Sequence, residues 1–270
     1  MSNNESRERA AREYQAANPG TSYTRARRQV TDGRPRRPLV AVLGEGLDGG
    51  VVSVNLEWES FGGTGPHCLV VGDEVSDLLG VLATGLAAGQ RDGDLELVLC
   101  AKPSTQLGVA HSRVDSDDLT SHVNDLLESR FRLLQSLEAV DIEDARARGH
   151  RIPTTVVLIE DYAGVWPGSQ ALARWLRMGR STGINVVVGT PVAPPTALTS
   201  NVDMSPARAL DRVVRTALHG NDMVAAMAPT TIFKLGGGRG TLRTMESWDP
   251  EGRMQRADVL VDFTFTAVSP

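Results

Sequence analysis

The sequence predicts an α/β protein with a mainly parallel sheet that carries helices on both faces. Four short runs are continuously apolar and rich in β-branched side chains, as is typical of strands buried on both faces of a parallel sheet. Segments with apolar residues at helical spacing separate these runs, so strands and helices alternate along the chain. The four runs are Cys68–Val71, Leu95–Cys100, Thr154–Ile159 and Ile184–Val188.

Residues 1–37 form a basic arm whose charge differs from that of the rest of the chain. The arm contains nine arginines and four acidic residues, a net charge of +5, whereas the remainder carries −10. Glu8–Ala17 and Ser22–Val30 are predicted to be short helices, with Tyr14 and Tyr23 packing between them. Such an arm either docks on its own domain or on a protein partner, or it binds an anion such as nucleic acid or a membrane surface. The arginines assigned to nucleic-acid or partner binding are Arg25, Arg27, Arg28, Arg36 and Arg37.

A linker, Gly33–Pro38, is predicted to connect the arm to a main domain that spans residues 38–270. The domain is expected to begin with a small β extension of two strands, Leu39–Leu43 and Val51–Leu56, joined by the turn 44–50.

The elements after the first helix of the domain are predicted from apolar spacing. A long helix contains Leu119, Val123, Leu127 and Leu134 on one face, with Asp117 or Asp118 as its N-cap. The further predicted elements are a helix Gln170–Met178 that ends near Gly179, a proline-rich loop 191–206, helices Arg208–Leu218 and Asn221–Met227, and a terminal strand Val259–Thr266.

Length and composition exclude several classes of protein. The 270 residues suffice for one large domain with an additional segment. The longest uncharged apolar stretch, Leu78–Gly89, is shorter than the roughly 20 residues that a membrane-spanning helix needs. The polar amino terminus lacks the apolar core of a secretory signal, and Cys68 and Cys100 lie inside strand-like runs, as buried thiols do in a reducing compartment. We therefore expect a cytoplasmic protein that reaches a membrane only through a partner.

At two strand ends the sequence carries residues that could bind a ligand or take part in catalysis. The strand Cys68–Val71 runs through Gly72 into an apolar-faced helix, and nucleotide-binding α/β proteins place their phosphate loop at such a junction. The strand Thr154–Ile159 ends in Glu160 and Asp161. An apolar strand that ends in two acids is the arrangement of a Walker B site, in which one carboxylate serves magnesium and the other serves water. Acidic residues often follow strands, so the pair alone is a weak signal for a Walker B site. Its expected position, two strands from the loop, strengthens that signal.

Five ordered segments resemble the FtsK/SpoIIIE ATPases, in particular the EccC-type ATPase modules of type VII secretion. Gly65–Gly72, which reads G-P-H-C-L-V-V-G, is similar to the segment before their phosphate loop, and Gly179–Val186 is similar to their arginine turn that enters a strand. Leu97–Lys102, the acidic strand end and the closing segment 236–242 follow in the family's order. The resemblance covers about residues 38–245 and implies a RecA-like P-loop fold whose relatives use ATP and magnesium and form rings or stacked modules.

The sequence departs from this family at the phosphate loop. Only residues 73–75 separate Gly72 from Ser76, where the family has six residues that include inner glycines and a lysine. A short loop without glycines cannot easily wrap its N–H groups around a phosphate. Asp73 and Glu74 also place negative charge where the anion would bind. The resemblance thus implies a degenerate nucleotide site formed by Gly72, Ser76, Asp77 and Lys102.

Three residues have alternative interpretations under this resemblance. Lys102, expected on the strand next to the loop strand, either replaces the missing cation or is simply the family's ordinary lysine at that position. Arg180 stands where the family places an arginine near a subunit interface, so it either acts in trans on a partner's nucleotide or pairs with a local acid. The acids Glu160 and Asp161 are expected to be vestigial. The five histidines show no metal-ligand spacing, and we expect no metal site.

Three functional hypotheses follow from these observations. In the first, which we favour, the chain is a catalytically inactive pseudo-ATPase that acts as a protein-binding or regulatory subunit of a secretion or DNA-transfer assembly. Its partner would be a related ATPase, a secretion substrate or a second copy of the chain, and binding of ATP and magnesium is not expected. The second is a DNA-binding FtsK-like protein of a mobile element. The third is an ATPase motor with a non-standard phosphate site.

Overall fold

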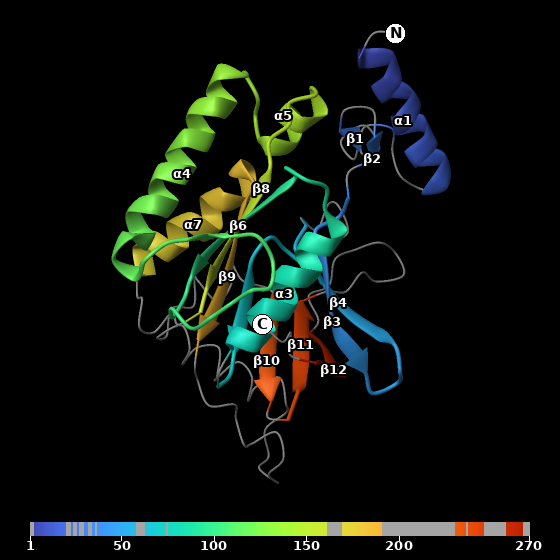
Figure 1. Cartoon of the computed structure of the whole chain (residues 1–270). Coiled ribbons are helices and arrows are strands. Elements are labelled where there is room, and N and C mark those ends of the chain that lie inside the picture. The colour runs from blue at the N-terminus through green and yellow to red at the C-terminus, as the bar shows by residue number, and fades with distance from the viewer. Residues whose placement is uncertain are drawn as a thin grey trace.

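A mixed sheet of ten strands forms the centre of the described part of the chain (Figure 1). The structure is a computed structural model that describes residues 3–19, 23, 26, 30–31, 34–35, 37–57, 63–73, 75–160, 169–190, 230–235, 237–245 and 258–266. The strands from β10 to β7 run parallel to one another, and the strands from β4 to β11 extend the sheet antiparallel. In spatial order the strands are β4 (Val51–Asn55), β3 (Val40–Gly46), β12 (Asp258–Thr264), β11 (Arg239–Met245), β10 (Thr230–Leu235), β5 (Cys68–Val71), β9 (Ile184–Thr190), β8 (Thr154–Ile159), β6 (Leu95–Cys100) and β7 (Ser112–Arg113).

Helices cover both faces of this sheet (Figure 1). Leu82 of α3 (Ser76–Gly89) packs among side chains from one face, and Trp175 of α7 (Ser169–Thr182) packs with α4 (Ser116–Ser136) on the other. Successive residues of a strand point to opposite faces, so the apolar runs of the parallel strands serve both clusters. The predicted architecture, a mainly parallel sheet with helices on both faces, is therefore confirmed. No helix in the described ranges is both long and apolar enough to cross a membrane.

The four predicted parallel strands are present, and β9 runs two residues further than predicted. The helix α7 continues through Gly179, where its end was expected, to Thr182. Gly179 serves close packing instead, since a Cβ there would lie 2.2 Å from the carbonyl oxygen of Ile184. The helix ends before Gly183, whose φ of +71° lies in the left-handed region that glycine adopts readily. The sequence predicts an end near Gly179, whereas the helix ends at Thr182, just before Gly183.

Other element boundaries also differ from expectation. The N-cap of α4 is Asp115, so the predicted caps Asp117 and Asp118 lie in its first turn, where their charges favour the helix dipole. The sequence did not predict the hairpin of β10 and β11, or the short helix α5 (Ile142–Ala147). The loop and helices predicted between residues 191 and 227 lie outside the described residues.

The basic arm has a small core of its own. The helix α1 (Asn3–Ala17) contains the first predicted helix, whereas most of the second, Ser22–Val30, lies outside the described residues. Val30 begins β1 (Val30–Thr31), which pairs with β2 (Arg34–Pro35) inside the predicted linker, so part of that linker is ordered as a ribbon. The arm core consists of Ala10, Ala11, Ala26 and Val30, and Tyr14 and Tyr23 pack against these residues.

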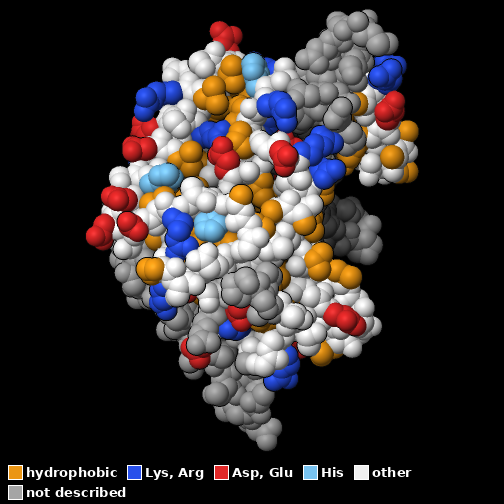
Figure 2. Space-filling model, viewed as in Figure 1, with side chains coloured by type: hydrophobic (Ala, Val, Ile, Leu, Met, Phe, Trp, Pro, Cys, Tyr) orange, Lys and Arg blue, Asp and Glu red, His pale blue; other side chains and the backbone are white. Residues whose placement is uncertain are grey.

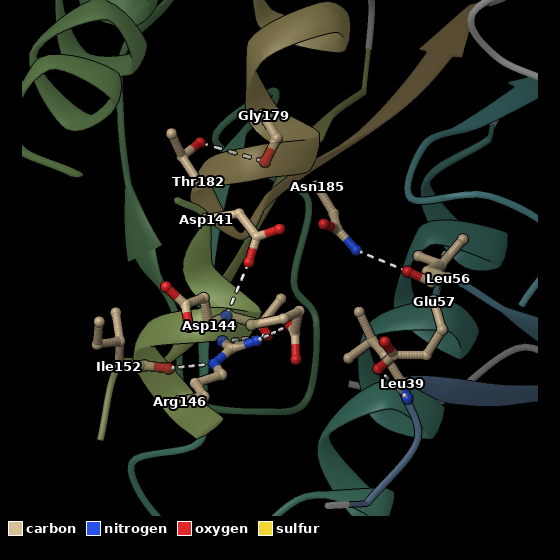
Figure 3. A network of polar contacts seen from close by, with 12 residues as sticks. Leu39, Leu56, Glu57, Asp141, Asp144, Arg146, Ile152, Gly179, Thr182 and Asn185 are labelled. Carbon is tan, nitrogen blue, oxygen red and sulfur yellow. Dashed lines mark hydrogen bonds and ion pairs between the residues drawn. The ribbon is translucent and has the colours of Figure 1, made fainter. Parts of the chain in front are cut away.

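Buried polar contacts close the amino-terminal edge of the parallel strands (Figure 3). Arg146 of α5 is only 5% exposed, and its guanidinium donates to the carbonyl of Ile152 at 2.9 Å and to the hydroxyl of Thr154 at 2.8 Å. At the start of β9, Asn185 donates from Nδ2 to the carbonyl of Leu56 at 2.9 Å. These bonds tie α5 and the end of β4 to the beginnings of β8 and β9. Ligands of open α/β sheets bind at the opposite, carboxyl-terminal edge.

We expect Gly85→Ala to destabilise the protein, because a Cβ at Gly85 of α3 would lie 3.0 Å from the Cα and Cβ of Ala41 on β3. Gly80 of the same helix is a matched control, since the nearest atom to its Cβ, the carbonyl oxygen of Gln106, is 3.8 Å away. Gly80→Ala should raise the free energy of unfolding by about 1 kcal/mol through helix propensity. Gly85→Ala should lower it by about 1 kcal/mol, because overpacking of about 2 kcal/mol outweighs the same gain in helix propensity. Urea unfolding measures both, and equal changes would contradict the close approach of α3 to β3.

Candidate functional site

The carboxyl end of β5 is the centre of the candidate site. Gly72 follows this buried strand with a φ of +149°, and its N–H donates to the carbonyl of Thr190 on β9 at 3.2 Å. A Cβ at this position would lie 2.7 Å from the backbone oxygen of Lys234 on β10. Glycine is therefore required here by both backbone angle and space. The predicted strand–turn–helix junction is present, with Ser76 as the first residue of α3.

An apolar side chain fills the short loop. Val75 is the N-cap residue of α3, makes no side-chain capping bond and is 2% exposed. A Cβ placed on Gly189 of β9 would lie 2.8 Å from Cγ2 of Val75 and 2.8 Å from the backbone oxygen of Glu160. Val75 thus packs directly against the end of β9. A buried valine lies where a phosphate loop would present its backbone N–H groups to an anion.

The structure brings Lys234 to this junction, and the sequence analysis did not assign it. Nζ of Lys234 lies 3.1 Å from Oδ2 of Asp77 in the first turn of α3, and the two side chains are 13% and 29% exposed. The strand β10 pairs directly with β5, which places the lysine beside Gly72. One signal was available in the sequence: Lys234 is one of only two lysines among 28 basic residues.

The expectation that Lys102 comes from the strand next to β5 is wrong. The strand β6 is separated from β5 by β8 and β9, because the chain crosses over between these strands. With strands about 4.8 Å apart, Lys102 starts roughly 14 Å from the loop strand. Its side chain is exposed, and its backbone N–H donates to Glu160 at 2.9 Å.

Glu160 directly follows β8, which lies two positions from β5 in the sheet, as predicted. The carboxylate is 6% exposed and accepts hydrogen bonds through Oε2 from the hydroxyl of Thr105 at 2.5 Å and from the N–H of Lys102 at 2.9 Å. These bonds hold the loop that follows β6. In this structure Glu160 therefore holds residues 102–105 in place, which differs from the activation of a water molecule. Asp161, its predicted companion, lies outside the described residues.

Arg180 lies at the other edge of the sheet from the loop. It is exposed in the last turn of α7, just before β9 begins, whereas Gly72 meets the end of β9. The length of β9, seven residues or about 23 Å, separates the two positions. Arg180 therefore does not belong to this chain's own junction, and a role in trans stays a prediction. Of the arm arginines, Arg37 is exposed and donates to the carbonyl of Gly89 at 3.4 Å; Arg25, Arg27, Arg28 and Arg36 lie outside the described residues.

His67 precedes β5 and is a buried structural residue. Its Nε2 donates to the carbonyl of Leu176 at 2.7 Å, and its Nδ1 accepts from the N–H of Val186 at 3.0 Å. Burial lowers the pKa of His67 to about 4; the positive charge of Arg180 acts in the same direction, and the bond to Leu176 opposes it. The neutral imidazole thus joins α7 and β9 to the segment that leads into the candidate site.

The residues at this junction do not fit ATP with magnesium. The ammonium of Lys234 already pairs with Asp77, and the exposed carboxylate of Asp73 adds a second negative charge to the short loop. Val75 fills space that a phosphate would need, and Glu160 is engaged by the loop after β6. No cluster of three or more His, Cys, Asp or Glu side chains suited to a metal occurs within the described residues.

Solved structures show which proteins share this fold. The cytoplasmic domain of the type VII secretion ATPase EccC from Thermomonospora curvata aligns with a TM-score of 0.62 at 20% identity, over 87% of this chain and 29% of that one. The chain has the fold of an FtsK/SpoIIIE-type P-loop ATPase module. ATPases 2 and 3 of the same EccC, in complex with a signal sequence peptide, give a TM-score of 0.55 at 17% identity, over 86% and 41% of the two chains. The pCW3 conjugation coupling protein TcpA, in monomer form with ATPγS, gives 0.54 at 14% identity, over 85% and 66%.

These similarities confirm the predicted fold class and its resemblance to EccC-type modules at the level of the fold. The chain spans less than a third of the EccC cytoplasmic domain and about two fifths of the fragment with ATPases 2 and 3. No protein-family model matches the sequence, and no curated protein is similar to it.

The buried imidazole of His67 should make stability fall below neutral pH. Its folded pKa of about 4 lies below the ordinary value of 6.5, so the unfolded chain binds a proton more readily. The contribution is complete above pH 6.5 and is lost as the pH falls towards 4, about 2 kcal/mol between pH 7 and pH 5. Urea unfolding at both pH values measures this loss. His67→Gln should reduce the pH dependence, and equal slopes in the wild type and His67→Gln would contradict the buried neutral ring.

Proposed function

We propose that this chain is a catalytically inactive module with an FtsK/EccC-like fold that acts by binding a protein partner. The observation that carries this proposal is the ion pair between Lys234 and Asp77, whose charged atoms lie 3.1 Å apart where a phosphate would otherwise bind. The only lysine near the junction in the described residues thereby has a carboxylate from its own chain as its counterion.

Rearranging the loop for a nucleotide would be costly. Asp77 would have to release Lys234, and separating a partly buried ion pair leaves charges without compensation. Val75 would also have to leave the core, which costs roughly 1.5–3 kcal/mol for a buried aliphatic side chain. An incoming phosphate would then face the carboxylates of Asp73 and Asp77.

Glu160, the acid at the position of the family's Walker B site, also has a structural role here. Glu160 accepts two hydrogen bonds, and bonds to a charged group are worth about 1.5–3 kcal/mol each. Turning this carboxylate toward a water molecule would release the loop after β6. We therefore assign Glu160 the role of a positioning residue for residues 102–105.

The setting of the module is proposed from its fold. Proteins with this fold include a type VII secretion ATPase and a conjugation coupling protein, and one EccC structure contains a bound signal sequence peptide. By analogy we propose that this chain is a regulatory or substrate-binding subunit of a secretion or DNA-transfer assembly, with a related ATPase or a secreted protein as its partner.

Calorimetric titration of the full chain with ATP and magnesium, together with a phosphate-release assay, tests the loss of catalysis. We expect neither saturable heat nor hydrolysis, because the anion site is closed by Lys234–Asp77 and Val75. The two lysines give a matched pair of variants, Lys234→Ala at the junction and Lys102→Ala three strands away. Saturable ATP binding that disappears in Lys234→Ala and persists in Lys102→Ala would mean that Lys234 has rebuilt the phosphate site. That result would overturn the proposal in favour of an ATPase motor.

A further inference from the structure

The hairpin of β3 and β4 exposes apolar side chains beside acidic ones. Leu47, Val51 and Val42 are 78%, 73% and 52% exposed, and they make up half of the exposed large apolar residues in the described part of the chain. The hairpin carries Glu45 and Asp48 and no basic residue. Figure 2 shows acidic and apolar side chains next to each other in this region, at the lower right. Apolar side chains that gather on an exposed surface commonly mark a site of interaction.

The strand β4 is an edge of the sheet without the usual protection. Within the described residues no strand pairs with its outer side, and Val51–Asn55 contains neither a charge nor a proline. Natural edge strands usually carry such residues to prevent pairing with other chains. An edge without them is suited to receive an added strand.

Hydrogen bonds at the two ends of β4 show which of its backbone groups point toward β3. The N–H of Leu56 donates to the carbonyl of Leu39 at 2.8 Å, and the carbonyl of Gly50 accepts from the N–H of Gly46 at 2.7 Å. Successive residues of an antiparallel strand direct their N–H and C=O groups to opposite sides. The even-numbered residues from 50 to 56 therefore face β3, and the odd-numbered residues from 51 to 55 face away from the sheet.

Val51 and Ser53 thus present open backbone groups at this edge. The third outward residue, Asn55, is already used, since its carbonyl accepts from the N–H and the hydroxyl of Thr64 at 2.8 and 3.1 Å. The outward groups of Val51 and Ser53 make no such bond within the described part of the chain. Each residue therefore offers one N–H donor and one C=O acceptor to an added strand.

The open backbone groups lie beside an exposed face that is apolar and acidic. Val42 lies opposite Ser53, and Glu45 lies opposite Val51, so the four side chains share one face of the sheet. All four are exposed. A strand added to β4 places one side chain of this face beside Val51 and Glu45. Another side chain reaches Val42 over the small Ser53.

The charge that this face offers to a partner is negative. The carboxylate of Glu45 makes no hydrogen bond or ion pair within the described residues. Arg239 of β11 is on the same face but two strands away, with Thr264 of β12 between it and Glu45. Asp48 in the turn is partly committed, since its Oδ1 accepts from the N–H of Gly50 at 2.9 Å. Glu45 therefore suits a basic side chain on an added strand.

We propose that β4 pairs with an extended segment of a partner protein, in which apolar residues alternate with polar ones and one residue is basic. Backbone bonds to Val51 and Ser53 hold the segment, and its alternate side chains meet Val42 and Glu45. The inference names a surface and a partner chemistry for the protein binding proposed above, and it rests on that proposal. Four strands separate β4 from β5, so peptide binding and ATP turnover are measured independently. Turnover with intact peptide binding would overturn only the loss of catalysis.

Fluorescence anisotropy of labelled peptides mixed with the full chain tests this inference. The probes are short peptides that alternate valine and threonine and differ only in one central residue, which is arginine, glutamine or glutamate. We expect the arginine peptide to bind most tightly and the glutamate peptide least, with a difference that shrinks at high salt. Equal binding of the three peptides, or no saturable binding of the arginine peptide up to about 1 mM, would overturn the inference.

Ser53→Pro tests the pairing of backbone groups. Proline removes the N–H that points outward and leaves the ladder bonds to β3 in place, so the variant should fold. It should weaken binding of the arginine peptide about tenfold or more, equivalent to at least 1.4 kcal/mol. Ser53→Thr keeps the N–H and is the matched control, with unchanged binding expected. Circular dichroism and thermal unfolding establish that both variants are folded.

Methylation of the peptide tests the same pairing on the unaltered chain. The arginine peptide with methyl groups on its backbone nitrogens cannot donate hydrogen bonds to β4, so it should not bind. Equal affinity of the methylated and unmethylated peptides, or a folded Ser53→Pro variant that binds like the wild type, would show that no strand is added to β4.

A change of charge at Glu45 tests the side-chain contact separately. Glu45→Gln should weaken binding of the arginine peptide about two- to fivefold, as for an exposed ion pair, and leave the glutamine peptide unaffected. Glu45→Arg should make the glutamate peptide the tighter ligand. Asp125→Asn is the matched control, since Asp125 is an exposed acid on α4. Equal effects of Glu45→Gln and Asp125→Asn on the arginine peptide would show that Glu45 does not face the added strand.

Discussion

The pairing of β10 with β5 is the contact on which the candidate site depends. The two strands are parallel and in register from Thr230 opposite Cys68 to Phe233 opposite Val71, and all four of these side chains are buried. The core thus fixes the next residues along, Lys234 and Gly72, beside each other at the carboxyl-terminal edge. Hydrophobic burial in the middle of the sheet supports a polar contact at its end.

Three features lie at the carboxyl-terminal edge of the sheet, and each uses a different interaction. Val75 is a buried apolar side chain, Lys234 and Asp77 form an ion pair, and Glu160 accepts hydrogen bonds from the loop after β6. A mutation that introduced a lysine into the loop would leave all three features in place.

The carboxyl-terminal and amino-terminal edges of the parallel strands carry different kinds of contact. The carboxyl-terminal edge holds the junction of β5 with α3, and the amino-terminal edge carries buried polar contacts such as those of Arg146 and Asn185. The arm contacts α5 at this second edge. The hairpin of β3 and β4 connects the two edges along the side of the sheet (Figure 1).

The sequence by itself determined the parallel strands, the strand–turn–helix junction at Gly72 and the acid at the end of β8, because each follows from local apolar patterning or from neighbouring residues. Its resemblance to the FtsK/SpoIIIE ATPases also implied a loop without the inner glycines and the lysine of that family. Only the tertiary structure decided that Lys234, not Lys102, lies at the junction, because strand order depends on crossovers that local patterns do not encode. The same holds for Gly179: its spacing resembles a helix stop, but its contact with Ile184 exists only once α7 and β9 have packed together.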